Sequence, residues 1–195
     1  MQKPLQPGHY YHIYNRGNNG ENIFLEKRNY LHFLKLYLHH IVPIAETFAY
    51  CLLKNHFHLL ICTKATSISE INELDSRYIT RQFNNFFIAY TKSINNGYNR
   101  TGSLFAPRFK RKPVDNERYF TYLVAYIHRN PQTHGFVDDF RSWPWSSYQA
   151  MLSEKPTNLE RGTVLDWFGG VEPFVDAHRF EIDEQIISSY VEGDW

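Results

Sequence analysis

The sequence predicts an α+β domain in which helices pack against a central antiparallel sheet. Runs rich in β-forming residues alternate with longer segments whose apolar residues recur at helical spacing. Two of the strand-like runs are separated by only two polar residues, which is typical of neighbouring antiparallel strands. With 195 residues, of which 43% are hydrophobic, the chain is long enough to bury one substantial core.

The elements are expected in the order strand, helix, strand, strand, helix, strand, helix. A run of β-formers followed by a turn cluster predicts the first strand, and the turn residues 95–97 end the long central helix. Asp115 could cap the last helix, and Pro131 should stop it. The expected strands are residues 8–15, 47–53, 56–62 and 104–109, and the expected helices are residues 27–40, 69–95 and 115–130.

Cysteine usage and hydropathy indicate the compartment. Cys51 and Cys62 lie in apolar runs without the spacing of a metal site, so we expect free thiols in a reducing compartment. No run approaches the roughly 20 apolar residues of a membrane span, and the N-terminus lacks the apolar core of a signal peptide. These features predict a cytoplasmic protein with no membrane partner.

The formal net charge of +1 conceals an uneven distribution. Residues 154–195 hold ten acidic and three basic residues, whereas residues 1–153 hold 18 basic and 10 acidic residues. A basic body is typical of a nucleic-acid-binding protein, although a drift of charge along the chain would give the same counts. We expect one domain over residues 1–150 and an acidic, helical extension of it over residues 151–195.

The sharpest local feature is the pair His56 and His58. Residues two apart on a strand point to the same face, so the two imidazoles should project together while Phe57 enters the core. Two converging imidazoles form half of a metal site. A pair of hydrogen-bonded surface histidines is the alternative.

A second feature lies on the last expected helix. Tyr126 and Asn130 are four residues apart and are therefore neighbours on one helix face. A tyrosine can act as a covalent nucleophile, and an amide oxygen is a hard ligand that suits Mg²⁺ or Mn²⁺. Alternatively, Tyr126 packs in the core and Asn130 caps the helix before Pro131.

The third feature is the segment 92–112, which is basic and contains no acidic residue. Tyr98, Phe105 and Phe109 are interleaved with its cations, and single-strand or hairpin binders combine cations for phosphates with rings for bases. A solvated basic loop is the alternative. The residues expected to bind DNA are Arg16, Lys92, Arg100, Arg108, Lys110, Arg111 and Lys112.

Five segments in this order resemble the REP-associated tyrosine transposases, a branch of the HUH single-strand transposases. They are residues 11–17 (YHIYNRG), 52–60 (LLKNHFHLL), 102–110 (GSLFAPRFK), 126–131 (YIHRNP) and 145–148 (WSSY). Each is weak by itself, but chance would rarely produce all five in sequence. Lys54 stands where the family usually has proline, and residues 106–107 and 132–134 also depart from the usual pattern.

The resemblance implies a ferredoxin-like fold and makes residues 1–150 an HUH tyrosine transposase domain. It implies that His56, His58 and Asn130 hold Mg²⁺ or Mn²⁺. It also implies that Tyr126 attacks a backbone phosphate and becomes linked to its 5′ side, which leaves a free 3′-hydroxyl. The family's DNA is a small imperfect hairpin with a short flanking recognition sequence. Single-stranded or hairpin DNA is therefore the expected partner of a monomer or homodimer.

Two other functions fit parts of the pattern. A non-catalytic nucleic-acid-binding domain would use the same basic surface with structural histidines. A zinc hydrolase would combine His56 and His58 with a distant histidine such as His12 or His128, because zinc prefers nitrogen-rich ligand sets.

Overall fold

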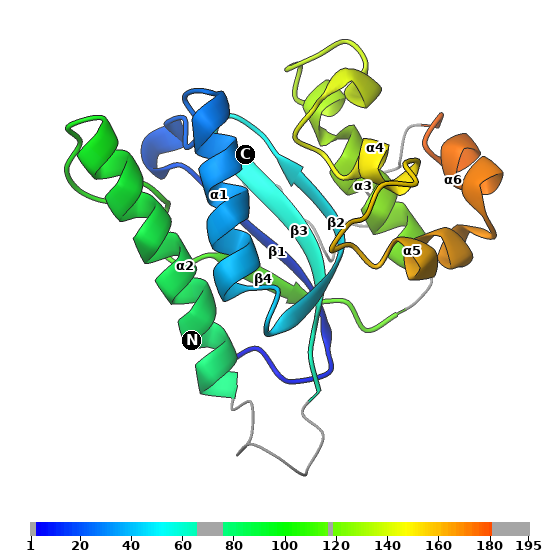
Figure 1. Ribbon diagram of the computed structural model, residues 1–195, viewed down its shortest axis with the longest axis horizontal. Coiled ribbons are helices and arrows are strands. Elements are labelled where there is room, and N and C mark those ends of the chain that lie inside the picture. The colour runs from blue at the N-terminus through cyan, green and yellow to red at the C-terminus, as the bar shows by residue number, and fades with distance from the viewer. Residues whose placement is uncertain (1–2, 66–75, 117–118, 181–195) are drawn as a thin grey trace.

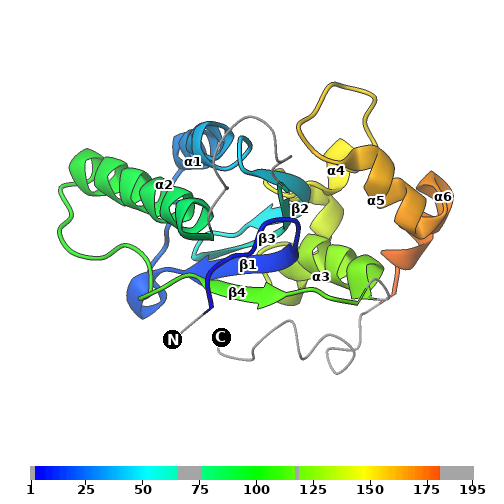
Figure 2. The same ribbon diagram turned by 90° about the horizontal axis from the view of Figure 1, so that it is seen from below.

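The computed structural model describes residues 3–65, 76–116 and 119–180. These residues form a four-stranded sheet with strand order β2-β3-β1-β4, in which every neighbouring pair is antiparallel. The strands are β1 (Tyr10–Arg16), β2 (Ala45–Leu52), β3 (His56–Thr63) and β4 (Lys110–Pro113). Figure 2 shows the strands in this order, with β4 at one edge.

Helices cover both faces of the sheet. Helices α1 (Lys27–His40) and α2 (Ser76–Gly97) connect the strands in the order β1-α1-β2-β3-α2-β4, which with this strand order is the ferredoxin-like arrangement. The other face carries α3 (Phe120–Thr133), followed by η3 (Phe140–Ser142), α4 (Tyr148–Met151), α5 (Arg161–Phe168) and α6 (Val171–Ala177). In Figure 1, α1 and α2 lie on one side of the strands and α3 to α6 on the other. The predicted α+β, ferredoxin-like class is confirmed.

Each face of the sheet has its own core, because side chains alternate along a strand. Phe57 on β3 faces α1 and α2, where it packs against Phe33 and Phe87. Leu60 faces the opposite way and belongs to the core beneath α3, together with Ile127. All of these side chains are buried, and burying one of this size contributes about 2 kcal/mol. Even-numbered residues of β3 therefore face α3, and odd-numbered residues face α1 and α2.

Two predicted elements differ from the structure. The strand expected at 104–109 is wrong: the fourth strand is β4, four residues long and basic, and it pairs with the edge of β1. Residues 104–109 instead place Leu104, Phe105 and Phe109 in the core beneath α2, and Arg108 takes a positive φ of 64° that a strand does not allow. The apolar side chains that suggested a strand are buried from a loop.

The boundaries of α3 also differ from the prediction. The helix begins at Phe120 rather than near Asp115, and it runs through Pro131 to Thr133. Pro131 removes one N–H, but the chain continues the turn because His134 N donates to the Asn130 carbonyl. Of the expected helix 69–95, residues 69–75 lie outside the described residues. So do residues 181–195 of the acidic extension, whose boundary at residue 150 stays a prediction.

Candidate active site

The two histidines of β3 lie together on the face covered by α3. The β1–β3 register pairs His56 with Arg16 and His58 with Tyr14, so all four side chains share that face. His56 and His58 are buried, with exposed fractions of 3% and 0%, and their ring centroids are 5.3 Å apart. The strand alternation thus brings two imidazoles into one dry site.

Other side chains hold the Nδ1 atom of each imidazole. His56 Nδ1 lies 2.8 Å from Asn55 Oδ1, and His58 Nδ1 lies 2.9 Å from Nε2 of the buried His12. Histidines that bind metals are usually oriented in this way through the nitrogen that does not bind the metal. The Nε2 atoms are therefore the ring nitrogens that a cation would take.

Helix α3 brings an amide to the same place. Asn130 is completely buried, and its Nδ2 donates a 2.8 Å hydrogen bond to the carbonyl of Tyr126, which fixes the orientation of the amide. Its Oδ1 is also buried but accepts no hydrogen bond from the described residues. A buried polar atom in this state costs about 1–3 kcal/mol unless a ligand satisfies it. Asn130 is thus the strongest local sign of a missing ligand.

Burial keeps the imidazoles neutral. It lowers the pKa of His56 to about 3, aided by the nearby His134 and Arg16, while the adjacent Asn130 side chain acts in the opposite direction. Burial also lowers the pKa of His58 well below its ordinary value, and the other histidines of the site add to this effect. Neutral imidazoles are the form that binds cations.

Tyr126 completes the arrangement. Its ring stands edge-on to His58 with a centroid distance of 5.7 Å and edge-on to His12 at 6.4 Å. It is buried, with 8% of its surface exposed, whereas Tyr122 one turn earlier is 43% exposed. The structure therefore brings together Tyr126, His56, His58 and Asn130.

His134 is a site residue that sequence reasoning missed. It follows the last turn of α3, and its ring centroid lies 4.9 Å from that of His56. Tyr126 and Asn130 on α3 and His134 at its C-cap are each four residues apart, and this spacing was the available signal for a shared face. In the sequence, residues 132–134 stand out only as a departure from the family pattern.

The basic residues are divided between the two faces. Arg16 and Arg108 are exposed near one end of β1, where Ala106 N donates to the Arg16 carbonyl. The β1–β4 register places Lys110 and Lys112 opposite Tyr14 and His12, and thus on the face of the imidazoles.

Three of the expected DNA-binding residues lie elsewhere. Arg111 is on the opposite face of β4, where burial lowers its pKa and its guanidinium lies 5.0 Å from the centroid of the Phe109 ring. Arg100 pairs with Glu21 and Asn95, and Lys92 is exposed on α2. The structure places Arg16, Lys110 and Lys112 on the face of the site, with Arg108 exposed near Arg16. Arg111 and Lys92 lie on the other side of the sheet, and Arg100 is paired with Glu21.

No family model matches this chain. It is 30% identical over 78 residues to the REP-associated tyrosine transposase of Escherichia coli (strain K12), which covers 40% of this chain and 43% of that protein. It is 27% identical over 111 residues to a putative REP-associated tyrosine transposase of Haemophilus influenzae, which covers 53% of this chain and 58% of that protein.

The resemblance to the REP-associated tyrosine transposases is confirmed. The chain spans about half the length of these curated relatives. A solved structure of a REP-associated tyrosine transposase bound to a REP hairpin matches with a TM-score of 0.56 over 80% of this chain and 87% of that one. At 19% identity, this last match shows the shared fold alone.

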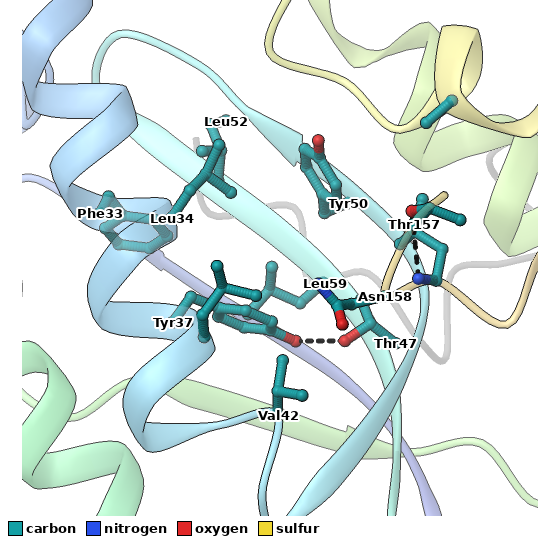
Figure 3. A pocket seen from close by; sticks show the side chains of 13 residues that line it. Phe33, Leu34, Tyr37, Val42, Thr47, Tyr50, Leu52, Leu59, Thr157 and Asn158 are labelled. Atoms are coloured by element: carbon teal, nitrogen blue, oxygen red, sulfur yellow. Dashed lines mark hydrogen bonds between the residues drawn. The ribbon is translucent and has the colours of Figure 1, made fainter. Parts of the chain in front are cut away.

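An apolar hollow on the other face of the sheet is separate from the candidate active site. It has a volume of about 210 Å³ and lies between α1, β2 and residues 157–159 (Figure 3). Its lining includes Leu59, which points away from His58, and a hydrogen bond of 2.8 Å between Tyr37 and Thr47. Nothing in the structure indicates what would occupy it.

Two further findings bear on the alternatives. In the described part of the chain, no three His, Cys, Asp or Glu side chains converge as a metal site, and His128 is bonded instead to His178 and Ser147. The partners of His128 disfavour a zinc site that combines it with His56 and His58. No helix among the described residues is long and apolar enough to span a bilayer.

Proposed function

We propose that this chain is a metal-dependent transposase that cleaves and rejoins single-stranded DNA at hairpin-forming repeats, through a 5′-phosphotyrosine intermediate on Tyr126. The observation that carries the proposal is the position of Tyr126, whose ring packs on His58 and whose carbonyl holds the amide of Asn130. Two of the proposed ligands and the proposed nucleophile are thus in direct contact.

The residues present fit a divalent cation such as Mg²⁺ or Mn²⁺. His56 and His58 would contribute Nε2 and Asn130 would contribute the buried Oδ1, which is a mixed set of nitrogen and oxygen ligands. Binding through Nε2 of His58 selects the tautomer in which Nδ1 donates to His12, as an orienting residue requires. When bound, the cation would polarise the scissile phosphate and offset its developing negative charge.

The protein's own residues then position and perform the exchange. The Tyr126 oxygen attacks the phosphorus, the bond to the 3′ oxygen breaks, and a phosphotyrosine and a 3′-hydroxyl result. The proton lost by the phenol equals the proton gained by the leaving oxygen, so the exchange is balanced. Because one phosphoester bond replaces another, the reverse attack by a 3′-hydroxyl rejoins strands without ATP.

The surroundings of the site support this reaction. Arg16, Lys110 and Lys112 lie on the imidazole face and would hold the strand through its phosphates. The packed environment of Tyr126 restricts its orientation, which favours in-line attack by avoiding the entropic cost of alignment at the moment of reaction.

Cleavage of a labelled single-stranded hairpin tests the proposal. The hairpin is taken from inverted repeats that flank the gene and is incubated with the protein plus Mn²⁺, Mg²⁺ or a chelator. We expect a cut at one position in the flank that depends on the cation. Tight binding without cleavage in either metal would instead support the alternative, a non-catalytic hairpin or single-strand nucleic-acid-binding protein.

A further inference from the structure

A second hollow lies on another flank of α3, against η3, α4 and α6. It has a volume of about 410 Å³, within the range of ligand sites, and shares no lining residue with the candidate active site. It is lined by Arg129, Gln132, Asp138, Asp139, Phe140, Arg141, Tyr148, Val175, His178 and Arg179. Nothing in the function proposed above uses it.

Most polar groups around the hollow are hydrogen-bond donors. Arg129 donates to the carbonyl of His178 and forms no ion pair with any described residue. Arg141 and Arg179 pair with Asp139 and Asp176, but all four side chains are 45% to 68% exposed. Exposed pairs of this kind contribute little, so both arginines can turn to a ligand.

Tyr148 adds a hydroxyl to the hollow. Only 3% of the residue's surface is exposed, but the hydroxyl itself reaches solvent, and it makes no hydrogen bond to any part of the chain that the structure describes. Burial raises its pKa, and Arg141, Asp139 and Arg179 also act on it, which places these charged groups around the hydroxyl. This hydroxyl can donate a hydrogen bond to an acceptor that enters the hollow.

We propose that this hollow binds a phosphodiester of the DNA strand that passes Tyr126. Guanidinium groups and a tyrosine hydroxyl match the oxygens of a phosphate, and Arg129 lies three residues from Tyr126, hence beside it on α3. The carboxylates of Asp138 and Asp139 favour a diester, with one negative charge, over a doubly charged free phosphate. This inference rests on the proposed function, because it requires a strand at Tyr126.

Binding measurements without cleavage test the hollow. Fluorescence anisotropy would be recorded without divalent cations, using hairpin DNA whose single-stranded flanks are lengthened one nucleotide at a time from each end. Arg129→Gln and Tyr148→Phe are compared with Arg81→Gln, which removes an equal charge from the exposed surface of α2. Thermal unfolding of each variant checks that it is folded.

With long flanks, we expect Arg129→Gln to weaken binding about tenfold, as for a lost hydrogen bond to a charged group, and Tyr148→Phe to weaken it about threefold. Both losses of affinity should disappear once the flank is too short to reach the hollow, because the unmodified protein then lacks the interaction as well. Arg81→Gln should bind like the unmodified protein at every length.

Two results would overturn the inference. One is a loss of DNA affinity in Arg129→Gln that is no larger than the loss in Arg81→Gln, or that is the same at all flank lengths. The other is that inorganic phosphate removes the difference in DNA affinity between the unmodified protein and Arg129→Gln. This result would assign the hollow to a free anion. The binding assay involves no catalysis. The proposed phosphate site can therefore be disproved while Tyr126→Phe still abolishes cleavage, and it can be supported even if the protein binds DNA without cutting it.

Discussion

Two clusters of buried histidines lie on different sides of α3, and they differ in how their hydrogen bonds are completed. In the cluster of His128 and His178, all four ring nitrogens have protein partners: the two rings bond each other, and Ser147 Oγ and the Phe174 carbonyl take the remaining nitrogens. In the candidate active site, the hydrogen bonds of His56 and His58 run through Nδ1, beside an Asn130 oxygen that accepts none.

The comparison shows that burial and a lowered pKa do not mark a functional histidine. Burial lowers the pKa of His128 well below its ordinary value and that of His178 to about 4, just as it lowers the pKa of His56 and His58. The informative difference is a polar atom that the fold leaves for a ligand. We therefore expect the first cluster to stabilise the fold and the second to serve the reaction.

The largest expected effect is on cleavage. His58→Ala should lower the cation-dependent cleavage rate about 10³-fold, because it removes a proposed ligand of the cation that would stabilise the developing negative charge. The fold should persist, since α3 is also held on the sheet by the apolar side chains of the core beneath it. Gel assays of hairpin cleavage and circular dichroism check the two outcomes, and a variant that cleaves normally would exclude His58 as a ligand.

The cluster of His128 and His178 should show the opposite response. His128→Ala leaves His178 and Ser147 as buried polar groups without their partner and opens a cavity, so it should cost about 3 kcal/mol of stability. Urea unfolding would measure this loss. Below the unfolding transition the variant should still cleave DNA, and a selective loss of cleavage with unchanged stability would break the distinction between the clusters.

His12 is expected to act through His58. His12→Phe removes the group that orients the His58 ring, so affinity for Mn²⁺ should fall about 10- to 100-fold. Titration calorimetry with Mn²⁺ measures the affinity without DNA. Unchanged affinity would mean that the bond between His12 and His58 is only structural.

Stability should depend on pH in one direction. The folded-state pKa of His178, about 4, lies below the unfolded value of about 6.5, so protonation favours the unfolded chain. Its contribution is complete above pH 6.5 and is lost as the pH falls toward about 4. The urea midpoint of unfolding should therefore decrease from pH 7 to pH 6 and again to pH 5.

Mn²⁺ should raise the urea midpoint at pH 7 only in proteins in which His58 is intact.

The smallest effect concerns the basic surface. Lys112→Gln, on the face of the imidazoles, should reduce the slope of log K against log salt by about 0.7 for single-stranded DNA. Lys92→Gln removes the same charge from α2 on the other side of the sheet. Equal slopes for the two variants would show that the strand does not follow the imidazole face.

The sequence predicted the parts of this molecule that depend on local pattern. Helix α1 begins and ends where its apolar spacing indicated. That His56 and His58 share one face of β3 follows from strand geometry alone. β4 could not be predicted in this way. Its residues are poor β-formers, and it exists because the edge of β1 supplies hydrogen bonds.

The remaining misses are consequences of tertiary packing. His134 joins the site only because α3 crosses β3 in a particular register, and no local pattern encodes that crossing. The basic segment 92–112 looked like one surface, yet alternation along β4 places Lys110 and Arg111 on opposite faces. Charge counts along a chain do not show which face a cation occupies.

Formation of a covalent adduct with DNA tests the central claim most directly. Protein is incubated with Mn²⁺ and hairpin DNA labelled at the 5′ or the 3′ end, and a denaturing gel is examined for a slow-migrating band. The band should carry the 3′ label, because a 5′-phosphotyrosine holds the downstream fragment, while the 5′ label leaves on the fragment with the free 3′-hydroxyl. Tyr126→Phe removes one oxygen and should abolish the adduct while hairpin binding persists. Tyr122→Phe, one turn away and 43% exposed, should retain it. An adduct that persists in Tyr126→Phe and disappears in Tyr122→Phe would contradict the proposed nucleophile.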